Sequence, residues 1–209
     1  MPRGWGGVGR ADSVCLLKIL VELAPRWDSL PGPPDAPARV EQFLDRVSPR
    51  PGETILDAGA GTGILAPGLG RRGCTFVEFD LAELMLAEAR RKRGGAPGSY
   101  VCGDLMNMPF AAGAFDAVLC FNTLPHARPV AEALQALWTC VAHGGRLAIG
   151  HMMDSRSLNE LHGTIGGAVS EDHLPAPAEV GAMLEALGAR VVAAEESARH
   201  YLVIAEAPR

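Results

Sequence analysis

The stretch Thr54-Ile55-Leu56-Asp57-Ala58-Gly59-Ala60-Gly61-Thr62-Gly63 decides the fold. Apolar and β-branched residues lead into an acid, and three glycines follow at alternate positions, which predicts a buried strand that ends in a tight loop. Glycine suits a loop that lies against a ligand, because it lacks a Cβ and tolerates positive φ. The loop opens a helix, whose first backbone N–H groups are free to face a bound group. The pattern therefore predicts a site for a small polar ligand at the carboxyl end of the first strand of an α/β sheet.

The composition is that of a soluble globular protein. The chain has 209 residues, which favours one large domain, with 48% hydrophobic and 21% charged residues. Its formal net charge of −5 argues against a nucleic acid or an anionic membrane surface as the main partner. An apolar run from Val14 to Leu23 is interrupted by Lys18 and Glu22, so we expect no membrane insertion there. The five cysteines show no CxxC pairing, which favours reduced thiols and a cytoplasmic protein.

From Glu53 onward the sequence alternates between strand-like and helix-like patterns. Such alternation predicts an α/β fold, a Rossmann-like and mostly parallel sheet with helices on both faces. The last two strand-like runs are joined by only about five residues, which is too short for a parallel crossover, so the final strand should be antiparallel. The expected strands are Thr54–Ala58, Thr75–Asp80, Ser99–Gly103, Asp116–Asn122, Arg146–His151, Val191–Ala194 and His200–Ala205.

The chain divides into two parts with different patterns. Residues 1–52 carry two amphipathic patterns separated by a proline-rich loop, and we expect them to form a helical cap or lid. Trp5 and Trp27 either cover the acceptor side of the cleft or fasten the first helix to the core. Residues 53–209 form the core, with an insertion at about 152–176 in which Ser155 or Ser157 is expected to cap a short helix.

Three acids stand at the ends of three successive predicted strands. Asp57 ends the first strand, Asp80 the second, and Asp104 follows the third. Because the carboxyl ends of parallel strands meet at one edge, all three should line the same crevice. Asp80 lies about 20 residues beyond the glycines, where a carboxylate can accept both ribose hydroxyls of a nucleotide. Acids also follow strands as turn formers or helix caps, and for Asp104 this simpler interpretation stays open.

The glycine spacing distinguishes two nucleotide interpretations. A nicotinamide dinucleotide site has the pattern G-x-G-x-x-G/A, whereas here Ile64 follows Gly61-Thr62-Gly63 and the third glycine comes one residue early. The sequence also shows no second, substrate-binding domain. An NAD-linked oxidoreductase is therefore the weaker interpretation.

The motifs together resemble those of class I S-adenosylmethionine-dependent methyltransferases. The stretch from Asp57 to Gly63 resembles the first motif of that family, Phe79 to Leu86 its ribose-binding segment, and Gly103 to Phe110 its adenine-binding segment. Phe115 to Asn122 and His143 to Leu147 resemble the fourth strand and the turn into the fifth. The family implies a seven-stranded sheet with the last strand antiparallel.

The resemblance also implies which residues hold S-adenosylmethionine. The glycine loop would cradle the methionine moiety, Asp80 would bind the ribose hydroxyls, and Asp104 would bind the adenine amine. Leu81 and Met106 would sandwich the ring, and Asn122 would place backbone near the sulfonium. The full expected set is Asp57, Gly59, Ala60, Gly61, Gly63, Asp80, Leu81, Met85, Asp104, Leu105, Met106 and Asn122.

Candidate catalytic residues are expected after the fourth and fifth strands. His126, His151 and His162 are the candidate bases, although His126 could equally be a loop or capping histidine. Asn159 and His162 are three residues apart and should share one face of the inserted helix. His151, His162 and His173 recur at eleven-residue intervals, which is not a metal-site spacing, so no metal is expected.

We therefore expect an enzyme that transfers a methyl group from S-adenosylmethionine to a small-molecule acceptor, leaving S-adenosylhomocysteine. Alignment of the reactants supplies most of such a rate enhancement, and a histidine base helps only an acceptor that must lose a proton. The chain is expected to act as a monomer or homodimer. The alternatives are a non-catalytic, cofactor-binding partner subunit and the NAD-linked oxidoreductase. The sequence does not identify the acceptor, because fold does not fix function.

Overall fold

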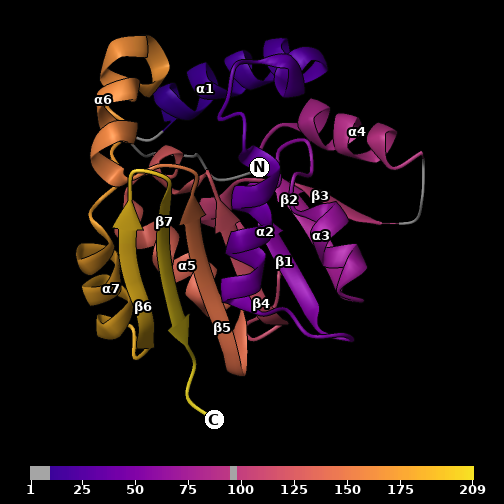
Figure 1. Ribbon diagram of the computed structural model, residues 1–209, viewed down its shortest axis with the longest axis vertical. Helices are drawn as coiled ribbons and strands as arrows, with labels where there is room; N and C mark the ends of the chain where they lie inside the picture. Colours follow the sequence, from indigo (N-terminus) through magenta and orange to yellow (C-terminus); the bar gives the residue numbers. More distant parts are fainter. Residues whose placement is uncertain (1–9, 95–97) are drawn as a thin grey trace, which may run out of the picture.

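The computed structural model describes residues 10–94 and 98–209, which are built around one seven-stranded sheet (Figure 1). The strand order is β3-β2-β1-β4-β5-β7-β6, and β7 alone runs antiparallel to its neighbours β5 and β6. This confirms the predicted fold class. The strands are β1 (Thr54–Ala58), β2 (Thr75–Asp80), β3 (Ser99–Cys102), β4 (Phe115–Phe121), β5 (Val141–His151), β6 (Arg190–Ser197) and β7 (His200–Glu206).

Helices cover both faces of the sheet and one of its ends. In Figure 1, α2 and α3 lie in front of the sheet, α5 and α7 lie behind it, and α1, α4 and α6 lie toward the upper end. The helices are α1 (Arg10–Leu23), α2 (Ala36–Val47), α3 (Ala66–Arg71), α4 (Glu83–Lys92), α5 (Val130–Thr139), α6 (Ser155–Ile165) and α7 (Pro177–Ala186). Short 3-10 turns are η1 (Ala24–Ser29), η2 (Leu105–Asn107), η3 (Leu124–His126) and η4 (Gly167–Val169).

Each face of the sheet carries its own hydrophobic core. On one face, Leu134 of α5 and Leu184 of α7 are fully buried against Val118 and Leu147. On the other face, Leu44 of α2 and Leu69 of α3 are buried in the same way. Burying side chains of this kind stabilises the fold by roughly 1.5–3 kcal/mol each. Both faces of the central strands are therefore covered, which leaves their carboxyl ends as the place where a ligand can approach.

The fifth strand is longer than the sequence predicts. It begins at Val141 rather than Arg146, and it continues through Gly144 and Gly145, where we expected a turn. The early part pairs Val141 with Phe115, and a register shift then brings Arg146 opposite Ala117. The glycines thus make an irregularity within a paired strand instead of ending it.

The predicted cap, residues 1–52, divides into two parts. Its helix α2 packs on the sheet through Phe43 and Leu44, so it belongs to the core. The segment formed by α1 and η1 lies instead at the carboxyl end of the strands, where α1 contacts α4. Trp5 lies outside the described residues.

The inserted helix α6 begins differently from the sequence expectation. Neither serine caps it: the carboxylate of Asp154 accepts hydrogen bonds from the backbone N–H and the hydroxyl of Ser157, both at 2.8 Å. A carboxylate is favoured at this position because it also interacts with the helix dipole.

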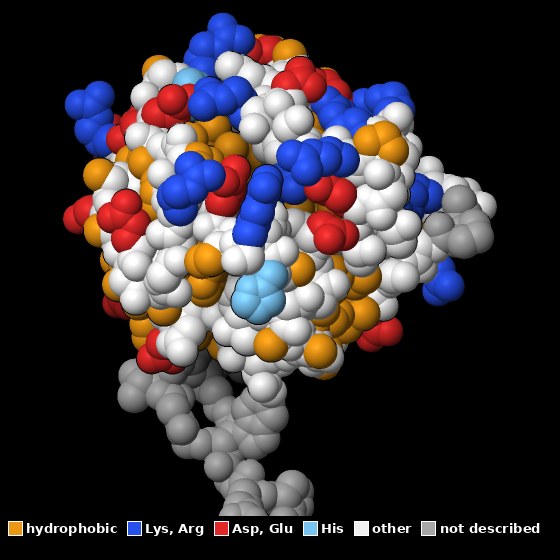
Figure 2. Space-filling model, turned by 90° about the horizontal axis from the view of Figure 1, so that it is seen from below, with side chains coloured by type: hydrophobic (Ala, Val, Ile, Leu, Met, Phe, Trp, Pro, Cys, Tyr) orange, Lys and Arg blue, Asp and Glu red, His pale blue; other side chains and the backbone are white. Residues whose placement is uncertain are grey.

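The opposite end of the molecule carries mixed charges. Figure 2 shows this end, where basic and acidic side chains lie next to one another on one side of a histidine. Arg146 bonds both carboxylate oxygens of Glu53 there, at 2.9 and 2.6 Å. In the described part of the chain, no helix has the length and apolar character needed to cross a membrane. The four cysteines whose side chains are described, Cys74, Cys102, Cys120 and Cys140, are free thiols.

Candidate active site

A cavity of about 230 Å³ lies at the carboxyl ends of β1, β2 and β4. All predicted cofactor-binding residues except Gly63 line it, and so does His126. The three acids that end successive strands therefore do share one cavity. Trp27, which was expected either to cover the cleft or to fasten the first helix, also lines it. Sequence reasoning did not select the remaining lining residues, which are Leu20, Asp28, Thr62, Ile64, Leu65, Phe79, Gly103, Phe121, Thr123, Ala127 and Arg128.

The three glycines of the loop all have positive φ, but they differ in what surrounds them. A Cβ on Gly59 would overlap the side chain of Thr123, whose hydroxyl donates to the Gly59 carbonyl at 3.1 Å. A Cβ on Gly61 would meet no atom within 4 Å, so this residue borders the open space. A Cβ on Gly63 would meet the Glu78 carboxylate, so Gly63 serves packing behind the loop rather than the cavity.

Asp80 is tied to the loop from the end of β2. Its carboxylate accepts hydrogen bonds from the backbone N–H groups of Gly61 at 2.7 Å and of Ala82 at 2.8 Å. Burial raises the pKa of this carboxyl, while the backbone hydrogen bonds act in the opposite direction. Asp80 thus fixes the shape of the loop and also borders the cavity.

Asp57 places a buried carboxyl group at the cavity floor. Only 1% of Asp57 is exposed, and its Oδ2 atom has no hydrogen-bond partner within the protein. Burial raises the pKa of the Asp57 carboxyl well above its usual value, repulsion from Glu78 and Asp80 adds to this, and Arg93 opposes it. A buried acceptor without a partner, in a cavity rich in carboxylates, fits a ligand that carries positive charge and N–H donors.

Asp104 is both a helix cap and a residue that lines the cavity, the two roles that the sequence left open. Its carboxylate caps η2 by accepting a hydrogen bond from the Met106 backbone N–H at 2.9 Å, and the residue also lines the cavity. Beside it, Leu81, Leu105 and Met106 supply apolar wall. This end of the cavity therefore pairs one polar acceptor with surfaces suited to a flat ring.

Behind the loop, Glu78 forms an ion pair with Arg93. Glu78 is fully buried, and the Arg93 guanidinium also lies 4.5 Å from the centroid of the Tyr100 ring. A basic run at 90–93 ends helix α4, and basic side chains at such a position commonly face solvent. Arg93 instead turns inward, because the buried Glu78 carboxylate requires a partner.

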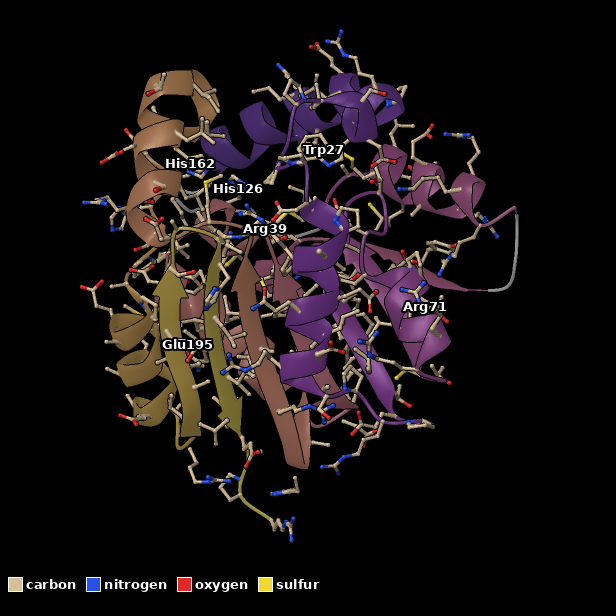
Figure 3. The ribbon with its side chains drawn as sticks, in the orientation of Figure 1. Trp27, Arg39, Arg71, His126, His162 and Glu195 are labelled. Carbon is tan, nitrogen blue, oxygen red and sulfur yellow. The ribbon has the colours of Figure 1, made fainter. Side chains whose placement is uncertain are left out.

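The candidate histidines form a cluster, but only His126 lines the cavity. The rings of His126 and His162 lie 5.3 Å apart, between η3 and α6 (Figure 3). His151 and His162 are buried, at 4% and 6% exposure, whereas His173 is exposed. The pKa of His151 is lowered to about 3, chiefly by burial and in part by the neighbouring His126 and His162. Among the residues described, no group of three or more His, Cys, Asp or Glu side chains is arranged to hold a metal ion.

Asp172 is the residue of this cluster that sequence reasoning did not assign. Its carboxylate accepts a hydrogen bond from Nδ1 of His126 at 2.5 Å, and its backbone carbonyl accepts one from Nδ1 of His162 at 3.1 Å. The only signal in the sequence was its position in the insertion beside two histidines. Forty-six residues separate it from His126, so only the fold could show the pairing.

The segment from α1 to η1 closes one side of the cavity. Trp27 and Asp28 of η1 line it together with Leu20 of α1 (Figure 3). Asp28 accepts a hydrogen bond from the Thr62 hydroxyl in the glycine loop at 2.6 Å, and it pairs with Lys92 of α4 at 2.7 Å. These two contacts fasten the N-terminal segment to the glycine loop and to α4.

This sheet order, with a glycine loop after β1 and an acid ending β2, defines a Rossmann-like domain that binds a nucleoside-containing cofactor. Residues 56–149 match a family model described as a methyltransferase domain. This region therefore resembles a methyltransferase domain, and the sheet order and the glycine loop agree with that resemblance.

Two similar proteins of assigned function align over about half of the chain. A demethylmenaquinone methyltransferase of Beutenbergia cavernae is 37% identical over 106 residues, which are 51% of this chain and 43% of that protein. A ubiquinone biosynthesis O-methyltransferase of Chromobacterium violaceum is 35% identical over 112 residues, which are 52% and 48% of the two chains. The matched region thus spans less than half of the length of each of these relatives.

Solved structures resemble the chain over a larger share of its length. A putative methyltransferase from Bacillus halodurans has a TM-score of 0.70 at 18% identity and covers 82% of this chain and 100% of its own. A SAM-dependent methyltransferase from Aquifex aeolicus has a TM-score of 0.67 at 21% identity, with 91% and 97% covered. At these identities the likeness shows the fold.

Proposed function

We propose that the protein transfers a methyl group from S-adenosylmethionine to a small-molecule acceptor. The observation that carries the proposal is the carboxylate-rich cavity around Asp57, whose buried Oδ2 atom has no partner in the protein. S-adenosylmethionine supplies an ammonium group for such an acceptor and a methyl group on a positively charged sulfur. The relatives named for demethylmenaquinone and ubiquinone biosynthesis support a small-molecule acceptor.

The proposed roles follow from the position of each residue along the cavity. Asp57 accepts N–H donors of the methionine moiety, and Gly61 leaves open space beside the loop. Asp80 holds the ribose hydroxyls while it keeps its bond to the Gly61 N–H, because each carboxylate oxygen can accept more than one hydrogen bond. Asp104 faces the adenine amine, and Leu81 and Met106 contact the adenine ring.

The side of the cavity that remains for the acceptor is formed by residues after β4. Asn122, Thr123 and His126 line this side. Asn122 has φ of 54°, and its side-chain oxygen accepts a hydrogen bond from the Met152 N–H at 3.0 Å, which joins the ends of β4 and β5. Of the three candidate bases, His126 is the one in position to contact an acceptor.

The N-terminal segment acts as a cap in this proposal. Trp27 and Leu20 exclude water from the cavity, and Asp28 fastens the cap to Thr62 and Lys92. Exclusion of water strengthens every electrostatic contact inside the site.

A dinucleotide is the weaker occupant of the same cavity. The pyrophosphate of NAD carries negative charge, and it would lie beside Asp57, Asp80 and Asp104, where like charges repel it. The proposal requires no nucleic acid, and the protein works as a monomer or homodimer.

Transfer of a labelled methyl group tests the proposal. The protein is incubated with methyl-labelled S-adenosylmethionine and a panel of phenols, enols, thiols and amines. The label that enters an organic extract is then counted. Label in an acceptor supports the proposal. Binding of S-adenosylhomocysteine without transfer to any acceptor would instead favour the non-catalytic partner subunit.

A further inference from the structure

The segment from Asp172 to Pro175 is held in place from three sides. The Asn159 side chain donates to the Leu174 carbonyl at 3.0 Å and accepts from the Leu174 N–H at 2.8 Å. His162, one turn further along α6, donates to the Asp172 carbonyl at 3.1 Å. The Tyr201 hydroxyl of β7 donates to the Pro175 carbonyl at 3.1 Å. The position of the Asp172 side chain is therefore fixed by elements of the core.

The Asp172 carboxylate is buried and divides its two oxygens between two partners. Its side chain is 3% exposed. Oδ2 lies 2.5 Å from Nδ1 of His126, and Oδ1 lies 3.4 Å from Nε of Arg128. Both His126 and Arg128 line the cavity, while Asp172 stands behind them.

This arrangement sets the tautomer of His126. An ionised carboxylate can only accept, so Nδ1 of His126 carries the proton of this hydrogen bond. The lone pair of the neutral imidazole is then on Nε2, at the opposite side of a ring that borders the cavity. The carbonyl of Asp172 imposes the same choice on Nδ1 of His162.

The charges around His126 come from several elements. Asp172 and the Arg128–Glu171 pair lie beside it, His162 faces it from α6, and His151, at the end of β5, is near enough to interact with it electrostatically. Burial lowers the pKa of His162 and the proximity of His126 adds to this, whereas the hydrogen bond to the Asp172 carbonyl acts in the opposite direction.

We propose that Asp172 is the positioning residue for a general base, Nε2 of His126, and that the acceptor presents a hydroxyl group to this nitrogen. The inference rests on the proposed function and names its acceptor class. The hydroxyl proton passes to Nε2 as the acceptor oxygen forms its bond to the methyl carbon. The methyl–sulfur bond breaks at the same time, and its electron pair stays on sulfur, which leaves as a neutral thioether.

A hydroxyl is the acceptor class that uses such a base. Phenols and enols with pKa near 10 are largely protonated at neutral pH, and their oxygen is a poor nucleophile until the proton is removed. A thiol ionises more readily, and a neutral amine already has a lone pair. A nitrogen that is held in the cavity to accept a proton, as Nε2 of His126 is, therefore increases the reactivity of an oxygen nucleophile most.

The variant Asp172→Asn tests the positioning role without any acceptor. Because Arg128 donates toward Oδ1, the amide oxygen of the new asparagine will face Arg128 and its NH₂ group will face His126. The NH₂ group then donates to Nδ1 and moves the imidazole proton to Nε2. Nitrogen–proton correlation spectra of the histidine rings distinguish the two tautomers, and the His126 signals are assigned by their loss in His126→Gln.

The expected result is an Nδ1–H tautomer for His126 in the wild-type protein and an Nε2–H tautomer in Asp172→Asn. Glu171→Gln is the matched control, because Glu171 is the exposed neighbour that contacts Arg128 without touching His126. It should leave the tautomer unchanged. An Nε2–H tautomer in the wild-type protein, or an unchanged tautomer in Asp172→Asn, overturns the positioning role.

Turnover tests the hydroxyl class, with catechol and 4-nitrocatechol as probes. Asp172→Asn should slow transfer to catechol by about 10²-fold or more, the scale of a lost general base. It should slow transfer to 4-nitrocatechol by less than about tenfold. The electron-withdrawing nitro group lowers the pKa of that hydroxyl, so the oxygen is already largely ionised without help from a base. Equal losses for the two probes, or transfer to thiols or amines only, overturn the inference.

Binding of S-adenosylhomocysteine separates this inference from the proposed function. The dissociation constant should stay within about twofold of the wild-type value in Asp172→Asn and Glu171→Gln, since neither residue lines the cavity. If the wild-type chain does not bind S-adenosylhomocysteine, the proposed function fails. If it binds and methylates a thiol or an amine, but neither catechol nor any other hydroxyl, only the inference about the acceptor fails.

Discussion

The Asp57 carboxylate should lower the stability of the ligand-free protein and strengthen binding of the cofactor. Its carboxylate is buried, lacks a partner at Oδ2, and lies near Glu78 and Asp80, so its charge opposes folding until a positively charged ligand arrives. Asp57→Asn removes this charge with little change in shape. We therefore expect the ligand-free variant to be more stable than the wild type and to bind S-adenosylmethionine more weakly.

The size of both effects follows from the environment of Asp57. A hydrogen bond to a charged group contributes about 1.5–3 kcal/mol, so its loss should raise the dissociation constant by roughly 10- to 150-fold. Each 1 kcal/mol of relieved charge burial should raise Tm by about 2–4 °C in a chain of this length. Titration calorimetry measures the first effect, and thermal unfolding without ligand measures the second.

The stability difference should also depend on pH. Because the pKa of Asp57 is raised in the folded state, its contribution to stability is fully present below the unfolded pKa and is lost as pH rises through the folded pKa. The advantage of Asp57→Asn should therefore grow from acid toward neutral pH. Asp116→Asn is the control, since Asp116 accepts from the Thr54 N–H at the opposite end of the sheet. A variant that binds like the wild type, or that unfolds at a lower Tm, would refute the reasoning about Asp57.

Three further changes test other parts of the site. Gly59→Ala should abolish cofactor binding and lower Tm, because the new methyl group overlaps Thr123 and φ is positive; wild-type affinity would contradict this assignment. Arg93→Met should destabilise the protein by about 3–5 kcal/mol in urea unfolding, because it leaves the buried Glu78 without its partner; a loss below 1 kcal/mol would count against the buried ion pair. Asp28→Ala should speed release of S-adenosylhomocysteine in stopped-flow displacement, because the cap loses the hydrogen bond to Thr62 and the ion pair with Lys92; an unchanged rate would separate these contacts from cofactor exchange.

Local sequence patterns predicted the elements whose neighbours in the chain determine them. The bounds of β1 and β2 agree with the prediction, because apolar runs that end in an acid and a glycine loop leave little choice. The antiparallel last strand followed from the short connection before His200. The shared cavity of Asp57, Asp80 and Asp104 followed from the rule that parallel strands end at one edge.

Contacts between distant segments could not be predicted in this way. Arg93 turns inward because β2 carries a buried acid, and Asp172 reaches His126 because α6 and β7 hold its segment. His173 shares the eleven-residue spacing of His151 and His162, but it is exposed, and it is its neighbour Asp172 that faces inward. A difference of one residue decides which side chain enters the site, and that choice depends on tertiary contacts.

Competition between two cofactors in a calorimeter tests the central claim most directly. The account predicts that S-adenosylhomocysteine binds the ligand-free chain at one site, that Asp80→Ala weakens this binding by about 1 kcal/mol or more, and that excess NAD does not displace it. Absence of binding heat, or displacement of S-adenosylhomocysteine by NAD, would contradict it.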